Sequence, residues 1–162
     1  MKSTYLQEAA ELWTNGKPLE AGRLIYENLA VEGRPKWAAR ILKMIQGRSG
    51  IQSSQMDYLI DIANNKHLWK EGHRVFNSIR DSTMQLDELR RTCGLSADEK
   101  LLNSVLSFAE IVAKVIYNAN NPPDEFDEDS GWWIAACLRG FVDNRWTDKA
   151  FAKEAWETLS SL

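Results

Sequence analysis

The chain has 162 residues, 44% hydrophobic and 27% charged, which is enough apolar material for one folded domain and disfavours disorder. Its net charge of −3 implies no bulk affinity for nucleic acid. No apolar stretch approaches the roughly 18 residues that a membrane-spanning helix needs. Two cysteines are too few for a disulfide framework or a zinc-binding set. We therefore expect a soluble protein of the reducing cytoplasm.

Apolar residues recur at helical spacing along the chain, and no segment alternates as a half-buried strand would. Turn signals such as Asn15–Pro18 and Asn120–Pro123 separate the helical segments. Ser96 and Glu99 form a capping box that opens one helix, and Gly94 ends the helix before it. We expect helices at residues 5–13, 19–31, 35–46, 56–64, 73–92, 97–119, 131–144 and 149–159, with a loop at 47–50.

The helix expected at 131–144 is apolar almost all round, which is typical of a buried helix. Gly140 lies inside it, where the missing side chain would permit close contact with another helix. The seven tryptophans are expected mainly to fill the core. These features predict an all-α fold, with residues 1–162 forming one domain that is a bundle or short array of seven to eight helices.

The first expected hairpin, residues 5–35, resembles a single tetratricopeptide repeat. The family's aromatic and small positions correspond here to Tyr5, Ala9, Leu12, Ala21 and Ile25. The sequence departs from the family pattern at Glu8, Asn28 and Gly33, and no second copy follows at the period of about 34 residues. The resemblance implies a helical protein-binding scaffold without catalysis, and it assigns no family to the whole chain.

The sequence contains no recognisable catalytic, metal-binding or cofactor-binding motif, so we expect no catalytic residue, no metal and no cofactor. The clustered candidate metal ligands are His67, Glu71 and His73. One helix cannot present all three on the same face. A calcium loop of the EF-hand type starting at Glu125 would need Gly and Glu where Ser130 and Ala136 stand.

The helix expected at 35–46 has one basic face. Lys36, Arg40 and Lys43 follow one another at helical spacing, and Arg34 precedes them. The apolar stripe of the same helix, on another face, contains Trp37, Ile41 and Ile45. The basic face could bind phosphates, an acidic protein or an anionic surface, or it could simply be solvated.

A short segment rich in carboxylates precedes the helix at 131–144. Its residues are Asp124, Glu125, Phe126, Asp127, Glu128 and Asp129. Acidic residues stabilise the positive end of a helix, but five of them in six positions exceed that need because they repel one another. Phe126 lies among them, and Trp132 and Trp133 follow closely. Such an acidic-aromatic segment favours a partner-binding role.

The charges are unevenly distributed between the two halves of the chain. Residues 1–80 carry 12 Lys and Arg against 8 Asp and Glu, whereas residues 81–162 carry 8 against 15. The acidic segment and the basic helix could therefore attract each other. One hypothesis places a carboxylate of the segment within about 6 Å of Arg34, Lys36 or Arg40, a range at which opposite charges interact appreciably.

The leading functional prediction is a non-enzymatic, cytoplasmic protein-interaction module. Its partner-binding surfaces are the acidic-aromatic segment and the basic helix face defined above. The alternative is a helical domain that binds a small molecule or metal in a Trp-lined pocket, and such a domain could be an enzyme. Nucleic-acid binding through the basic helix is the least favoured interpretation, and no membrane association is expected. The sequence predicts neither the identity of the partner nor an oligomeric state.

Overall fold

The computed structural model describes residues 4–120 and 129–161, which form eight α-helices, two 3-10 helices and no strand. The predicted all-α fold is therefore confirmed. The α-helices are α1 (Thr4–Thr14), α2 (Pro18–Asn28), α3 (Arg34–Ser49), α4 (Ser54–Ala63), α5 (Gly72–Thr92), α6 (Ala97–Asn120), α7 (Asp129–Asn144) and α8 (Lys149–Leu159). The 3-10 helices are η1 (Val31–Gly33) and η2 (Lys66–Glu71).

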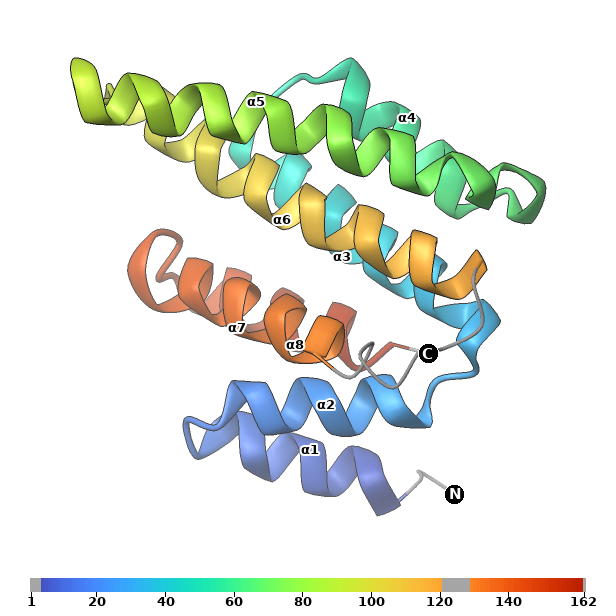
Figure 1. Ribbon diagram of the computed structural model, residues 1–162. Helices are drawn as coiled ribbons and strands as arrows, with labels where there is room; N and C mark the ends of the chain where they lie inside the picture. Colours follow the sequence, from blue (N-terminus) through green and yellow to red (C-terminus); the bar gives the residue numbers. More distant parts are fainter. Residues whose placement is uncertain (1–3, 121–128, 162) are drawn as a thin grey trace.

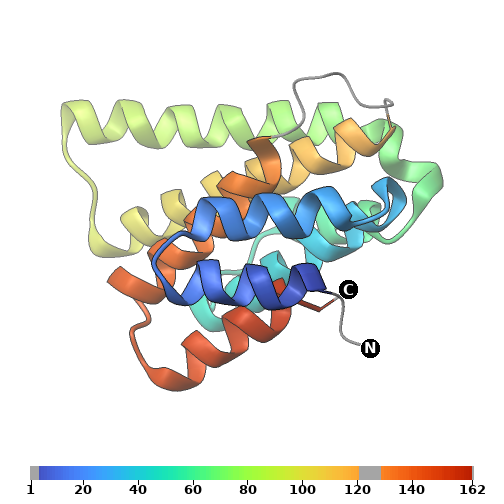
Figure 2. The same cartoon turned by 90° about the horizontal axis from the view of Figure 1, so that it is seen from below.

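The helices stack in layers, and the C-terminal helices lie inside the stack (Figure 1). The central pair is α3 and α6, which carries α4 and α5 on one side. On the other side α7 contacts α6 and α8 contacts α3. Next comes α2, which packs mainly on α7, and α1 lies outermost. The α1–α2 hairpin thus forms one outer face of the molecule (Figure 2) and is connected to the centre mainly through α7.

The buried apolar side chains form one continuous cluster to which all eight α-helices contribute. The central helix α6 supplies eight buried residues, including Phe108 and Val112, both fully buried. By length and composition alone α6 could also cross a membrane, but core helices of water-soluble proteins meet the same criteria. Burial of these side chains is the main source of stability for the fold.

Local signals fix several helix ends, and the sequence predicted two of them, the Ser96–Glu99 capping box and Gly94. The Ser96 hydroxyl accepts a hydrogen bond from the Glu99 amide at 3.2 Å, and the Glu99 carboxylate accepts one from the Ser96 amide at 3.0 Å. Asp148 caps α8 by accepting a hydrogen bond from the Phe151 amide at 2.8 Å. Gly94, with φ of 77°, follows the end of α5 in the left-handed conformation that favours glycine.

The predicted loop at residues 47–50 is wrong, because α3 continues through Gly47 to Ser49. Gly47 is exposed and has no neighbouring atom within 4 Å of an added Cβ, so nothing forces the helix to end there. The helix ends at Gly50, whose φ of 71° lies in the left-handed region. The Gly50 amide donates to the Gln46 carbonyl at 3.0 Å, which closes the last turn.

The close helix contact expected at Gly140 does not occur there. Among the described residues, no atom of another helix lies within 4 Å of the Cβ that an alanine would place at Gly140. The close crossing is instead between α2 and α7, where Gly22 faces Gly131 and Ala135. A close helix crossing needs glycine at the position where the two helix axes meet. The sequence of α7 alone does not specify that position.

Candidate interaction surface

Helix α3 separates a basic face from an apolar face, as its sequence predicted. Lys36, Arg40 and Lys43 are all exposed. The opposite side of the helix is fully buried and consists of Trp37, Ile41 and Ile45. The apolar side therefore fixes the orientation of the helix, and the basic face is presented on a rigid support.

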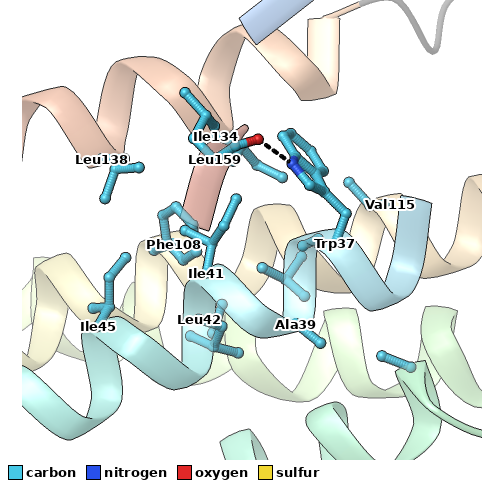
Figure 3. Packing of buried hydrophobic residues seen from close by; sticks show 14 of the residues in the cluster. Trp37, Ala39, Ile41, Leu42, Ile45, Phe108, Val115, Ile134, Leu138 and Leu159 are labelled. Carbon is cyan, nitrogen blue, oxygen red and sulfur yellow. Dashed lines mark hydrogen bonds between the residues drawn. The ribbon is translucent and has the colours of Figure 1, made fainter. Parts of the chain in front are cut away.

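Trp37 anchors the first turns of α3 (Figure 3). Its indole Nε1 donates a hydrogen bond to the Leu159 carbonyl of α8 at 2.8 Å, and this bond is buried. The ring centroid lies 5.9 Å from that of Tyr26. Because the indole is fully buried with its polar atom paired, Trp37 joins α3 to α8 without a desolvation penalty.

Two arginines of the predicted basic surface make contacts within the fold. Arg34 Nε donates to the Tyr26 carbonyl at 3.2 Å, and its guanidinium lies 4.1 Å from the centroid of the Tyr26 ring. Arg40 Nη2 donates to the Ser161 carbonyl at 2.6 Å, while Nη1 lies 3.4 Å from the Ser161 hydroxyl. Both side chains therefore help to hold neighbouring segments, which reduces their freedom to turn toward a partner.

The two lysines of the basic face are placed differently. Among the described residues, no carboxylate forms an ion pair with Lys36 or Lys43. Arg48, in the last turn of the same helix, pairs with Asp148 and is therefore neutralised. Lys36 and Lys43 are thus the residues of α3 whose charges are best placed to meet a partner.

Most of the acidic-aromatic segment, residues 124–128, lies outside the described residues, and Asp129 is described only as the first residue of α7. The hypothesis of a contact between this segment and Arg34, Lys36 or Arg40 therefore stays a prediction. The residues that follow the segment, in the first turn of α7, are described.

The first turn of α7 places two tryptophans in different environments. Trp132 lies against α2, with the Arg23 guanidinium 5.1 Å from its ring centroid. Its indole Nε1 is buried and has no hydrogen-bond acceptor among the described residues. Trp133 is 54% exposed, so the expectation that this helix is buried all round is wrong. Because α2 and α6 cover only part of α7, an apolar residue on its remaining face projects into solvent.

The described residues contain no group of three His, Cys, Asp or Glu side chains that could hold a metal ion together. His67 and His73 are both exposed, and the His73 ring lies 5.0 Å from that of Tyr117. Burial raises the pKa of the Cys137 thiol, which is the opposite of what a reactive nucleophile needs.

Two of the open grooves among the described residues adjoin α6. One, of about 530 Å³, lies between the start of α4 and the helices α5 and α6. The other, of about 390 Å³, lies between α6 and α7 and is lined by Asn103, Ser104, Ser107, Cys137, Gly140, Phe141, Asn144 and Arg145. Neither groove has a tryptophan in its lining. The sequence did not predict the second groove, although three of its lining residues, Asn103, Ser104 and Ser107, form a polar group on α6.

Comparisons with protein-family models, with curated proteins and with solved structures found no match to this chain. The tetratricopeptide resemblance of residues 5–35 therefore stays a prediction. Functional proposals for this protein depend on its own residues and their arrangement.

Proposed function

We propose that this protein is a non-enzymatic protein-interaction module of the cytoplasm. It binds an acidic surface of its partner through the basic face of α3, and the acidic-aromatic segment 124–129 makes a second contact with the same partner. The observation that carries the proposal is the exposure of Lys36 and Lys43 on a helix whose opposite face is fully buried.

Two properties of α3 support a binding role for its basic face. The helix cannot rotate, because Trp37, Ile41 and Ile45 lie in the core, so its lysines keep their relative positions. Charged groups presented in this way speed association and select partners of complementary charge. The net negative charge of the whole chain favours an acidic protein patch over a long nucleic acid as the partner, because a nucleic acid would be repelled by the rest of the surface.

The test is an affinity capture from host lysate with the full chain as bait. The first variant carries Lys36→Gln and Lys43→Gln, and its matched control carries Lys70→Gln and Lys149→Gln, which alter two exposed lysines elsewhere. A second variant changes the acids among residues 124–129 to Asn or Gln. Its control neutralises the exposed acids Glu8, Glu11, Glu20, Asp81 and Glu154. Circular dichroism and melting curves establish that every variant is folded.

We expect one partner to bind wild type and both controls, and to bind the α3 variant at least tenfold more weakly. The difference in affinity between wild type and the α3 variant should be smaller at high salt, because screening by salt already weakens the binding of wild type. A partner that binds the α3 variant as tightly as wild type overturns the role of the basic face. If the partner binds the variant with the neutralised acidic segment as tightly as it binds wild type, the segment is not part of the interface.

A further inference from the structure

The turn between α1 and α2 closes with the two hydrogen bonds of a Schellman motif. The Lys17 amide donates to the Leu12 carbonyl at 2.8 Å. The Gly16 amide donates to the Trp13 carbonyl at 3.3 Å. Gly16 has a φ of 77°, the left-handed conformation that this motif requires just past the end of the helix. The cap of α1 therefore favours a glycine directly after Asn15.

Asn15 and Gly16 form an asparagine–glycine pair in an open part of the surface. Both residues are exposed, and no atom lies within 4 Å of a Cβ added at Gly16. The Asn15 side chain makes no hydrogen bond to another described residue, so it is free to turn toward the Gly16 nitrogen. Gly16 has no side chain to obstruct that approach. Its hydrogen bond of 3.3 Å to the Trp13 carbonyl is longer than the usual range of about 2.7–3.2 Å, so the nitrogen is weakly held.

Other described asparagines are more restrained than Asn15. The side chains of three of them donate hydrogen bonds of 2.8 Å to carbonyls four positions earlier, namely Asn28, Asn64 and Asn65. Asn77 and Asn103 precede serines inside α5 and α6, where the following amide is bonded within the helix. A reaction between an asparagine side chain and the next backbone nitrogen therefore meets less resistance at Asn15 than at these positions.

We propose that Asn15 is a site of spontaneous deamidation. The Gly16 nitrogen bonds to Cγ of Asn15 while the bond from Cγ to Nδ2 breaks, and Nδ2 leaves as ammonia with the proton that the Gly16 nitrogen loses. Water then opens the resulting succinimide ring. Breaking the new bond to Cγ gives aspartate at position 15. Breaking the original peptide bond to the Gly16 nitrogen instead gives isoaspartate, in which the main chain runs through the former side chain.

Deamidation at this position should loosen the end of α1. Isoaspartate adds one carbon atom to the main chain before Gly16, so the amides of Gly16 and Lys17 lose their alignment with the last carbonyls of the helix. Both products also place a carboxylate at the C-terminal end of α1, where the helix dipole disfavours negative charge. The conversion therefore weakens the turn that joins α1 to α2. This inference does not depend on the function proposed above.

The test incubates the folded, full-length protein at about pH 8 and about 37 °C in heavy-oxygen water. Ring opening by this water leaves one heavy oxygen atom at position 15, so peptide mass spectrometry separates new conversion from conversion before purification. Asn15→Gln is the control variant, because glutamine must form a less favourable six-membered ring. Asn77 and Asn103 are internal controls in the same sample. The chain unfolded in guanidinium chloride gives the rate of Asn15 in the absence of structure.

We expect Asn15 in the folded protein to convert at least about tenfold faster than Asn77 or Asn103. The separated isoaspartyl protein should melt about 2–4 °C below the unmodified protein, and hydrogen exchange should quicken at the Lys17 amide. Asn15→Gln should keep its mass and its melting temperature throughout. Conversion of Asn15 no faster than that of Asn77 overturns the proposal, and so does conversion more than about a hundredfold slower than in the unfolded chain. An isoaspartyl form that melts with the unmodified protein overturns the predicted loss of the cap.

Discussion

Gly22 of α2 and Gly131 of α7 meet backbone to backbone. A Cβ atom on Gly22 would lie 2.4 Å from the Gly131 carbonyl oxygen, and one on Gly131 would lie 2.9 Å from the Gly22 carbonyl oxygen. Non-bonded carbon and oxygen atoms do not approach so closely. The two helices therefore cross at this distance because neither residue has a side chain, and this crossing attaches the α1–α2 hairpin to the rest of the molecule.

Gly22→Ala and Gly131→Ala are each expected to lower the free energy of unfolding by about 2–3 kcal/mol, because the helices must separate to admit the methyl group. Gly140→Ala is the control, since its methyl group enters open space and a helical alanine is favoured over glycine by about 1 kcal/mol. Urea unfolding measures all three. Variants at the crossing that are as stable as wild type would contradict the close packing.

Trp37→Phe is expected to lower the free energy of unfolding by about 1–3 kcal/mol, because the buried Leu159 carbonyl loses its donor. Hydrogen exchange should also quicken at amides in the last turn of α8. Trp133→Phe, at an exposed position, should change stability by less than about 0.5 kcal/mol. Equal effects at the two positions would indicate that the Trp37–Leu159 hydrogen bond contributes nothing.

The cap of α8 is expected to make stability depend on pH. The Phe151 amide and the Arg48 guanidinium hold the pKa of Asp148 below its ordinary value. A carboxyl group with a lowered pKa in the folded state contributes stability above its unfolded value of about 3.9, and this contribution is lost as the pH falls through the folded pKa. Acidification below about pH 4 should therefore lower the melting temperature.

Asp148→Asn separates the cap from its titration. The amide oxygen can still accept the Phe151 hydrogen bond, so we expect this variant to lose less of its melting temperature on acidification than wild type does. Asp148→Ala removes the acceptor and should melt at a lower temperature even at neutral pH. Parallel acid profiles for wild type and Asp148→Asn would show that Asp148 does not titrate with folding.

The two cysteines are expected to react at different rates with a disulfide reagent. Cys93 is exposed at the end of α5, whereas burial raises the pKa of Cys137 and reduces its thiolate fraction. Near pH 8, wild type should show a fast and a slow phase, about tenfold or more apart. Cys93→Ser should retain the slow phase alone, and a surviving fast phase would show that Cys137 is accessible.

The features that the sequence predicted correctly depend on residues that are close to one another in the chain. The Ser96–Glu99 capping box and the two faces of α3 follow from signals within one or two helical turns, so they could be read without a fold. The basic residues of the candidate surface were also identified in this way. Their contacts could not be identified from the sequence. Arg40, for example, donates a hydrogen bond to the Ser161 carbonyl, which lies 121 positions away in the chain.

What the sequence could not show is which helices pack together. The apolar composition of α7 indicated full burial, but its neighbours leave one stripe open, and Trp133 lies on it. Gly140 and Gly131 look alike in the sequence, and only the crossing with α2 distinguishes them. The open groove follows from the same arrangement, which is a property of tertiary packing rather than of any local pattern.

The placement of α7 and α8 inside the stack has a consequence for synthesis. The α1–α2 hairpin leaves the ribosome before its main packing partner α7, because α3, α4, α5 and α6 are translated between them. The apolar face of α2 stays uncovered while the central helices are made, and a nascent chain in that state is prone to aggregate or to recruit chaperones. Helices α1 and α2 are thus synthesised before α7 and are enclosed only after it has been made.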